Sequence, residues 1–394
     1  MLNITRIKTG DEMKLSPKNV PEVLRKLEER GHQAVFVGGC VRDSLLGRKP
    51  SDWDAATSAL PAEVLGIFKK CLSTGIKHGT VTVLDYGRPV EVTTFRAEST
   101  YTDHRRPDSV FFGCSLEDDL ARRDFTVNAM ALDLRGNITD PFGGRTDLGR
   151  GLLRCVGEPE RRFSEDALRM LRAVRFSAQL GFGIEPSALE TIQRLSHLAL
   201  GLSAERVRDE LMKTLQSPRP RLAWQLVDIG LLDGFIGSGD PAAPRSIAAS
   251  APLCSRLARF CLGLESGAYI DSTEALLIRL RMDAASVKNT AAAVEILKSG
   301  SRDWKRLLRD YGVQAVLTAH PWSRGLRDVL SSGDCWNLRQ LAVDGKQLAD
   351  LGYSGPELGR ALDGLLEHVI DHPADNREDI LLGLLNKERC DMNG

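Results

Sequence analysis

The sequence predicts an α/β head, built on a small mixed sheet with helices, followed by an elongated all-α remainder. In the first third of the chain, short apolar runs of strand type alternate with helical segments. After about residue 158 the strand signals nearly vanish, and helical periodicity continues to the end. At 394 residues, the chain is long enough for two or more domains with buried cores.

The elements of the head follow one another closely. In chain order they are a strand over residues 34–37, a helix over 41–46, a strand over 52–55, and strands over 81–86 and 90–95. The last two strands are separated by Gly87-Arg88-Pro89, which predicts a hairpin.

The remainder reads as a series of helices. The clearest are residues 165–177, 204–215, 274–282 and 284–298. Ser203 is a suitable N-cap for the second of these helices. The last two form a predicted helical pair.

Charge and composition narrow the function classes. The chain has 53 basic and 53 acidic residues, which argues against a protein that coats nucleic acid nonspecifically. Positive charge confined to one face would still allow RNA binding. No stretch approaches twenty unbroken apolar residues, and the charged first 14 residues do not resemble a secretory signal. We therefore expect a cytoplasmic protein without a membrane partner.

Two glycines join the first strand to the first helix. Gly38 and Gly39 would let the backbone come close to a ligand, and the helix start would offer N–H groups to an anion. Arg42, in the first helical turn, could reach the same phosphate. Taken alone, the glycine pair fits a purely structural turn as well.

Two aspartates follow on the next strand. Asp52 and Asp54 are two residues apart, so both side chains point to one face of a strand. Two carboxylates this close repel each other and lose solvation, an arrangement that persists mainly when a divalent cation neutralises it. Mg²⁺ is the hard, oxygen-seeking ion that also bridges triphosphates. The glycine turn, the helix and the aspartates together predict a Mg²⁺ and phosphate site.

These residues carry a family resemblance. The string from Gly38 to Arg48, closing with residues 52–57, resembles the first motif of class II tRNA nucleotidyltransferases, in the DNA polymerase β-like superfamily. The resemblance implies an enzyme that adds C, C and A to the tRNA 3′ end from CTP and ATP without a template. It also implies a third catalytic carboxylate on a neighbouring strand, and Glu91 matches that pattern. In two-metal phosphoryl transfer, one Mg²⁺ activates the RNA 3′-hydroxyl and the other holds the triphosphate.

A second string, residues 122–131, resembles the family's second motif. Arg123 matches the nucleotide-contacting arginine of the family, and Asn128 is expected to help orient the ribose or a loop.

A third string places one acid and three bases at regular spacing. Asp166, Arg169, Arg172 and Arg175 recur every third residue and would form one winding stripe on a helix that faces phosphates and a base. The string resembles the family motif E-D-x-x-R, in which the Asp and the Arg read the incoming base. Cytosine and adenine both present an amine beside a ring-nitrogen acceptor. Uracil and guanine would place a carbonyl oxygen against Asp166, which disfavours them.

The resemblance divides the chain into four parts. They are a catalytic head (1–157), a neck with the templating helix (158–234), a body (235–330) and a tRNA-binding tail (331–394). Residues 203–211 resemble the neck of relatives, and residues 345–348 and 355–360 resemble the tail, which grips tRNA in relatives. The expected partner is the tRNA acceptor stem and elbow; no motif identifies a protein partner.

Several alternatives share these motifs. An A-adding enzyme or a poly(A) polymerase would look similar. Residues 77–83 resemble the CCA-adding group more than the polymerases, and residues 95–107 resemble the flexible loop that A addition needs and that CC-adding relatives have shortened. A catalytically dead RNA-binding scaffold predicts the loss of Asp52, Asp54 or Arg123, and all three are present.

Overall fold

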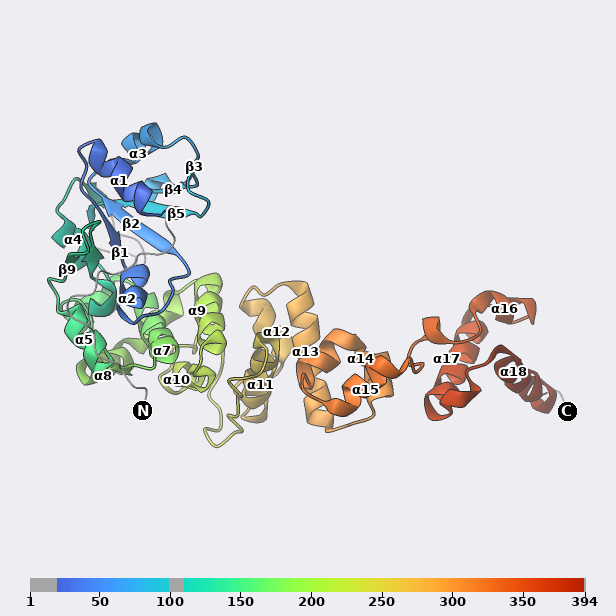
Figure 1. Cartoon of the computed structure of the whole chain (residues 1–394). Coiled ribbons are helices and arrows are strands. Elements are labelled where there is room, and N and C mark those ends of the chain that lie inside the picture. Colours follow the sequence, from blue (N-terminus) through green and yellow to red (C-terminus); the bar gives the residue numbers. More distant parts are fainter. Residues whose placement is uncertain (1–19, 99–109, 393–394) are drawn as a thin grey trace. The chain divides into compact units, whose positions relative to one another are not determined.

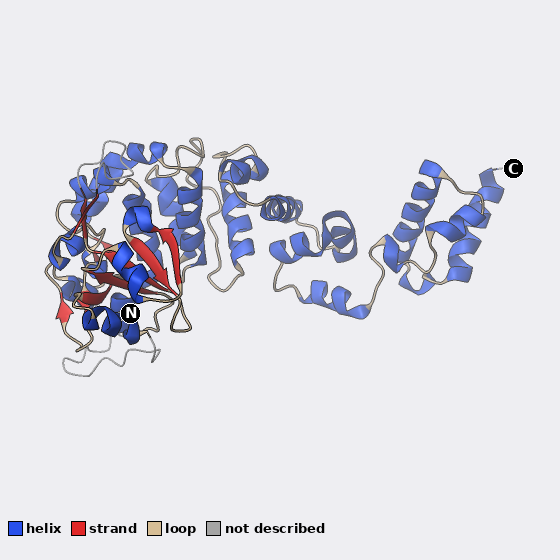
Figure 2. Ribbon diagram, turned by 90° about the horizontal axis from the view of Figure 1, so that it is seen from above, coloured by secondary structure: helices blue, strands red, loops and turns tan. Residues whose placement is uncertain are grey.

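The computed structural model describes residues 20–98 and 110–392. Two compact units divide the chain, Met1–Ile236 and Gly237–Gly394. All described strands belong to the first unit, whereas the regular elements described in the second unit are helices (Figures 1 and 2). The predicted α/β head followed by a helical remainder is therefore confirmed.

The first unit is built around a seven-stranded mixed sheet with the strand order β3-β4-β5-β2-β1-β8-β9. Its strands are β1 (Ala34–Val37), β2 (Trp53–Thr57), β3 (Cys71–Gly75), β4 (Thr80–Val83), β5 (Val90–Thr94), β8 (Ala131–Leu132) and β9 (Ile138–Thr139). β2 and β5 run parallel, and the other neighbours are antiparallel. The predicted hairpin is the antiparallel pair β4–β5. The rings of Phe36 and Trp53 pack edge to face at 4.8 Å and anchor β1 to β2.

Helices surround this sheet and continue beyond it. They are α1 (Pro21–Glu29), α2 (Gly39–Leu45), α3 (Pro61–Ile67), α4 (Leu116–Ala121), α5 (Gly144–Arg150), α6 (Pro159–Glu165), α7 (Leu168–Leu180), α8 (Pro186–Leu195), α9 (Ala204–Gln216) and α10 (Ala223–Asp228). Two small sheets pair β6 (Arg96–Glu98) with β7 (Val110–Phe112), and β10 (Leu152–Leu153) with β11 (Gly183–Ile184). Helix α7 is almost entirely buried and packs against α9.

The helix predicted over residues 165–177 is two helices. α6 ends at Glu165 and α7 begins at Leu168, with Asp166 in an extended conformation between them (φ −146°, ψ 104°). Oδ1 of Asp166 accepts a hydrogen bond from the backbone N–H of Leu168 at 3.1 Å. Short polar side chains compete with the helical backbone in this way. The prediction that Asp166 belongs to a helical stripe is therefore wrong, although the three arginines do lie on α7.

The second unit consists of helices packed on one another. They are α11 (Leu253–Ser266), α12 (Thr273–Arg279), α13 (Ala284–Ser299), α14 (Trp304–Ala319), α15 (Arg324–Ser332), α16 (Gly345–Asp350), α17 (Gly355–Asp371) and α18 (Glu378–Met392). The predicted helical pair is α12 and α13. Of the described helices, none is long and apolar enough to cross a membrane. The boundaries of head, neck, body and tail at residues 157, 234 and 330 stay predictions.

Candidate active site

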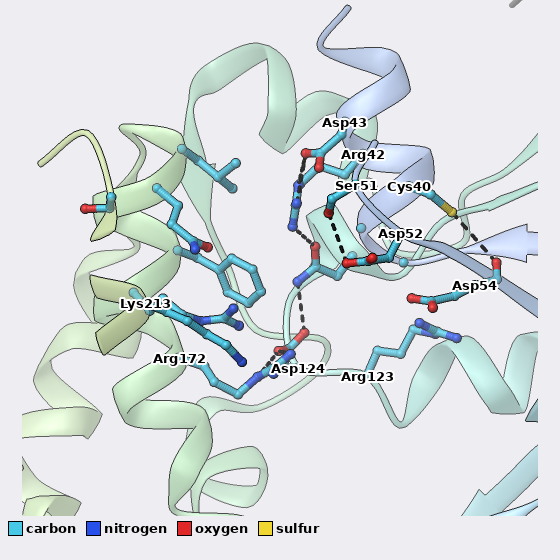
Figure 3. A pocket seen from close by; sticks show the side chains of 18 of the residues that line it. Cys40, Arg42, Asp43, Ser51, Asp52, Asp54, Arg123, Asp124, Arg172 and Lys213 are labelled. Carbon is cyan, nitrogen blue, oxygen red and sulfur yellow. Dashed lines mark hydrogen bonds and ion pairs between the residues drawn. The ribbon is translucent and has the colours of Figure 1, made fainter. Parts of the chain in front are cut away.

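A cavity of about 1090 Å³ opens in the first unit. Its walls come from the turn before α2, the start of β2, the segment after α4, and helices α7 and α9 (Figure 3). The predicted site residues that line it are Gly38, Gly39, Arg42, Asp52, Asp54, Arg123, Asp166, Arg169, Arg172 and Arg175. Glu91, the remaining member of the predicted set, does not line the cavity.

Gly38 forms the turn between β1 and α2. Its backbone has φ 76° and ψ −136°, a conformation that side chains rarely adopt. A Cβ at this position would lie 3.1 Å from Nη1 of Arg123 and 3.7 Å from Oδ2 of Asp54. A glycine is therefore needed for the backbone to pass beside these two side chains, as the sequence predicted for a close approach to the site.

Three carboxylates gather near the start of β2. β2 begins at Trp53, so Asp52 lies just before the strand and the prediction that it belongs to the strand is wrong by one residue. Asp52 is exposed and accepts a hydrogen bond from the Ser51 hydroxyl at 3.0 Å. Asp54 lies on β2 directly beside Glu91 of the parallel strand β5. Trp53 between the aspartates is buried on the core side, which sends Asp54 toward the cavity.

The charge at Asp54 is poorly compensated by the protein. Burial, followed by the negative charges of Glu91 and Asp52, raises the pKa of Asp54 to about 6, although Arg123 acts in the opposite direction. Carboxylate oxygens are the ligands that hard divalent cations prefer, and such a cation would relieve this repulsion. The donors at Asp52 and Asp54 therefore fit a divalent metal. Among the described residues, no group of three or more His, Cys, Asp or Glu side chains is placed to hold a metal ion.

Arg123 is positioned by an acid that sequence reasoning missed. Its Nη2 lies 3.1 Å from Oδ2 of Asp119, whose side chain is fully buried in α4 and also pairs with Arg122 at 2.7 Å. Burial acts to raise the pKa of Asp119, but the two arginines lower it below its usual range. The i, i+3 and i, i+4 spacing of these pairs in residues 119–123 was visible in the sequence and could have identified Asp119.

A polar relay links α2 to α7. Nη1 of Arg42 donates to Oδ1 of Asn128 at 2.7 Å, and Nδ2 of Asn128 donates to Oδ1 of Asp124 at 3.2 Å. Asp124 in turn accepts from Nε of Arg172 at 2.7 Å. Burial would raise the pKa of Asp124, but Arg172 and the hydrogen bonds lower it to about 2. Arg42 and Arg172 are thereby fixed on opposite sides of one network (Figure 3).

Phe176 gathers three guanidinium groups. Its ring centroid lies 5.3 Å from Cζ of Arg42, 5.2 Å from that of Arg172 and 4.0 Å from that of Arg175. Arg175 also forms a buried ion pair with Glu210 of α9 at 2.6 Å. Burial lowers the pKa of Arg175 to about 10. The aromatic face and the acid together hold this part of the cavity wall in place.

Asp166 and Arg169 both line the cavity, but each pairs with a different residue. Nη2 of Arg206 lies 3.0 Å and 2.7 Å from the two carboxylate oxygens of Asp166. Nη1 of Arg169 lies 2.7 Å from Oε2 of Glu165, and its guanidinium also donates to two backbone carbonyls. Arg206 is 40 residues from Asp166, so no local spacing could have revealed their contact.

Three further cations line the cavity and were not predicted, Arg48, Lys49 and Lys213. All three are exposed, and Figure 3 shows Lys213 beside Arg172, across the pocket from Asp54. The predicted flexible loop, residues 95–107, begins just before β6 and includes that strand, but its residues 99–107 lie outside the described residues.

Comparison with known proteins identifies the family. Residues 34–154 match the family model described as the poly A polymerase head domain, and residues 181–239 match a model described as a probable RNA and SrmB-binding site of polymerase A. A CCA-adding enzyme of Geobacillus stearothermophilus is 37% identical over 388 residues, covering 93% of this chain and 96% of that protein. The chain belongs to the CCA-adding enzyme family.

Other members of the CCA-adding enzyme family support the assignment over different lengths. The enzyme of Lactobacillus johnsonii is 50% identical over 236 residues, a match that spans 57% of this chain and 59% of that protein. The crystal structure of the Bacillus stearothermophilus CCA-adding enzyme in complex with CTP superposes with a TM-score of 0.80 at 33% identity, covering 95% of this chain and 98% of that one. A Thermotoga maritima CCA-adding enzyme complexed with tRNA shares the fold, with a TM-score of 0.63 at 19% identity, over 93% of this chain and 94% of that one.

Membership of the family makes the chain an enzyme and confirms the resemblance found in its motifs. It also implies a divalent metal, which agrees with the carboxylates beside the cavity.

Proposed function

We propose that this chain adds C, C and A to the 3′ end of tRNA, using CTP and ATP without a template and releasing pyrophosphate. The observation that carries this proposal is the single cavity that joins the Asp52 and Asp54 carboxylates to the arginine-rich wall of α7. Full-length similarity to CCA-adding enzymes supports the same reaction. The cytoplasmic location predicted from the sequence is part of the proposal.

Asp52 and Asp54 would hold Mg²⁺, because the buried Asp54 carboxylate, repelled by Glu91 and Asp52, favours a hard divalent cation. When bound, the metal would supply charge stabilisation for the triphosphate and lower the pKa of the attacking 3′-hydroxyl. Glu91, which lies beside Asp54 but outside the cavity lining, would act through its charge on Asp54.

The cationic wall would hold the triphosphate. Arg123 lies next to Asp54 across Gly38, and its contact with the buried Asp119 fixes its position. Arg42 and Arg172 are held by the Asn128 and Asp124 relay, so their guanidinium groups are already placed when a nucleotide enters. A preorganised set of donors stabilises developing phosphate charge without reorganisation during the reaction.

Asp166 and Arg169 would select the base. Asp166 would accept a hydrogen bond from the amine of cytosine or adenine, and Arg169 would donate to the adjacent ring nitrogen. A carbonyl oxygen on uracil or guanine would face the Asp166 carboxylate and be repelled. Each residue is positioned by a partner, Arg206 for Asp166 and Glu165 for Arg169.

The test is to supply the protein with tRNA that lacks its last three nucleotides, together with CTP, ATP or both, and to sequence the products. CTP alone should give tRNA ending in CC, and both nucleotides should give CCA. Addition of A only to tRNA that already ends in CC would instead identify an A-adding enzyme. Long A tails would identify a poly(A) polymerase, and no extension under any condition would favour a scaffold.

A further inference from the structure

One aromatic ring lies among the cations that line the cavity. Phe176, on α7, is itself part of the cavity lining and is 6% exposed. The fully buried ring of Phe125 packs edge to face with it, with the ring centroids 5.9 Å apart and an interplanar angle of 83°. Because this contact and the buried helix α7 both restrict the Phe176 ring, its orientation is fixed before a ligand enters.

Three guanidinium groups lie over this ring. Their Cζ atoms are 4.0 Å (Arg175), 5.2 Å (Arg172) and 5.3 Å (Arg42) from the ring centroid. Arg172 and Phe176 have an i, i+4 spacing on α7 and so share one face of that helix, whereas Arg42 comes from α2. A single aromatic ring therefore joins cations from two elements that lie far apart in the sequence.

The acid beside Arg175 does not set the orientation of its guanidinium. Nε of Arg175 and Oε2 of Glu210 are 2.6 Å apart, but both atoms are buried and neither has a hydrogen-bond partner among the described residues. Their contact is thus an ion pair without the directional geometry of a hydrogen bond. The Phe176 ring, 4.0 Å from Cζ, is therefore the contact that orients this guanidinium.

The three cations also repel one another. Burial lowers the pKa of Arg175 to about 10, against the opposing charge of Glu210. The nearby charges of Arg172 and Arg42 lower it further. The face of a phenyl ring attracts cations, so Phe176 offsets part of this repulsion. Unlike a carboxylate, the ring takes up none of the guanidinium N–H donors, and these are the groups that bind phosphate oxygens.

We propose that Phe176 is a positioning residue for the triphosphate of the incoming nucleotide. Its ring holds the three guanidinium groups together at the cavity wall, so that they need not be brought together against their repulsion when a polyphosphate binds. Because the triphosphate is common to CTP and ATP, Phe176 affects both nucleotides equally and leaves the choice of base to other residues. This assignment rests on the proposed function, which supplies the nucleotides.

The experiment replaces the phenyl ring at position 176 with phenyl rings that carry increasing numbers of fluorine atoms. Fluorine withdraws electron density from the ring faces but changes the size of the side chain little, so packing is kept while the attraction for cations declines. The probe is inorganic tripolyphosphate, whose affinity for the full-length protein is measured by calorimetry without Mg²⁺.

The matched control is the same fluorinated series at Phe36. This ring is fully buried and also packs edge to face, on Trp53, but no cation lies over it within the described residues. A second variant, Phe176→Leu, removes the ring and keeps an apolar side chain. Thermal midpoints measured along both series show that each protein is folded.

We expect the logarithm of the tripolyphosphate affinity to fall steadily as fluorine atoms are added at position 176, with an overall loss of about tenfold. Phe176→Leu should lose about as much as the most heavily fluorinated protein, and the Phe36 series should keep the wild-type affinity. With tRNA as the acceptor, the KM values for CTP and ATP should rise by one common factor along the Phe176 series. The ratio of kcat/KM between the two nucleotides should stay at its wild-type value.

A tripolyphosphate affinity that stays constant along the Phe176 series would overturn the proposal, even if Phe176→Leu binds more weakly, because the ring would then serve packing alone. Tighter binding along the series would also overturn it, since the cations would not be placed in advance by the ring. Tripolyphosphate is measured without tRNA or nucleotide. If its affinity falls as expected but the protein extends no tRNA, the proposed function is refuted and Phe176 remains the positioning residue of a polyphosphate site.

Discussion

Nη2 of Arg206 spans both carboxylate oxygens of Asp166, at 3.0 Å and 2.7 Å. Nη1 of the same guanidinium is buried and has no hydrogen-bond partner within the described residues, although Arg206 lines the cavity. Asp166 lies in an extended break between two helices, so backbone geometry alone does not fix its carboxylate. Arg206 therefore orients the acid that is proposed to read the base.

Removing Arg206 should imitate the loss of Asp166. We expect Arg206→Ala to lower kcat/KM for CTP and ATP by about tenfold, the effect of about 1.4 kcal/mol. The double variant with Asp166→Ala should be no worse than Asp166→Ala alone, because both substitutions remove the same oriented acceptor. Arg194→Ala is the control, since it breaks an exposed ion pair with Glu160 and should change kcat/KM less than about twofold. Losses that multiply in the double variant would show that Arg206 acts independently of Asp166.

Asp166→Ala should change nucleotide preference as well as rate. A hydrogen bond from a charged group is worth roughly 1.5–3 kcal/mol, so CTP and ATP should be used at least about tenfold less efficiently. UTP and GTP should fall less or rise, because the repulsion of their carbonyl oxygens is also removed. The measurement is steady-state incorporation of all four nucleotides on one tRNA. A common factor for all four would mean that Asp166 only caps α7.

Gly38→Ala should impair the site through a specific clash. The new methyl group would lie 3.1 Å from Nη1 of Arg123, and the backbone φ of 76° adds strain. We expect kcat to fall by more than about tenfold. Gly47→Ala is the control. Its backbone φ of 67° imposes a similar strain on alanine, but the added Cβ would meet nothing within 4 Å. If both variants lose activity equally, the backbone conformation and not the approach to Arg123 is responsible.

Asp54→Asn should stabilise the metal-free protein in a pH-dependent manner. The folded pKa of Asp54, about 6, lies above its ordinary value of 3.8, so the folded state binds more protons between these values. Wild-type stability attributable to Asp54 therefore falls as pH rises from about 4 to 6 and stays low above that range. At pH 7 the variant should be more stable by roughly 1–3 kcal/mol, with no difference near pH 4. The measurement is the free energy of unfolding of both proteins, obtained from urea denaturation between pH 4 and pH 7.

The same pair of proteins tests the metal. Added Mg²⁺ should raise the thermal midpoint of the wild type and have a smaller effect on Asp54→Asn, because binding to the folded state stabilises it. Asp271→Asn, at an exposed position in the second unit, should behave like the wild type at every pH and Mg²⁺ concentration. An equal response of the wild type and Asp54→Asn to Mg²⁺ would place the metal elsewhere.

The sequence predicted the elements whose signals are local. The strand at residues 34–37 and the β4–β5 hairpin alternate or run apolar between turn residues, and they fold as expected. The strands β8 to β11 were missed, because each has only two residues and is too short to show a strand periodicity. The break at Asp166 was also missed. The regular spacing of residues 166, 169, 172 and 175 predicted one continuous helix. It gave no sign that the Asp166 side chain accepts from the N–H of Leu168 at the start of α7 and pairs with Arg206.

For the site, residue spacing and the family resemblance identified side chains that line the cavity. They did not identify the ion-pair partners that fix these side chains in position. Each of four predicted site residues forms an ion pair with a residue that was not predicted. The pairs are Arg123 with Asp119, Arg169 with Glu165, Asp166 with Arg206, and Arg175 with Glu210.

The pairs of Asp119 with Arg123 and of Glu165 with Arg169 have an i, i+4 spacing that is visible in the sequence. The pairs of Glu210 with Arg175 and of Arg206 with Asp166 join residues far apart in the chain and depend on how α7 and α9 pack. The family resemblance placed Glu91 on a strand next to that of Asp54, and the strand register pairs the two residues, but Glu91 does not line the cavity.

The relay from Arg42 to Arg172 limits how the catalytic head can be exchanged between related enzymes. It crosses residue 157, the predicted end of the head, because Asp124 lies before that point and Arg172 after it. A fragment cut there would retain the 8% exposed carboxylate of Asp124 and lose its cation, a defect worth about 3–5 kcal/mol. The head is therefore not a portable module. A chimaera that exchanges heads between relatives has to carry α7 along, or supply an equivalent guanidinium from the recipient.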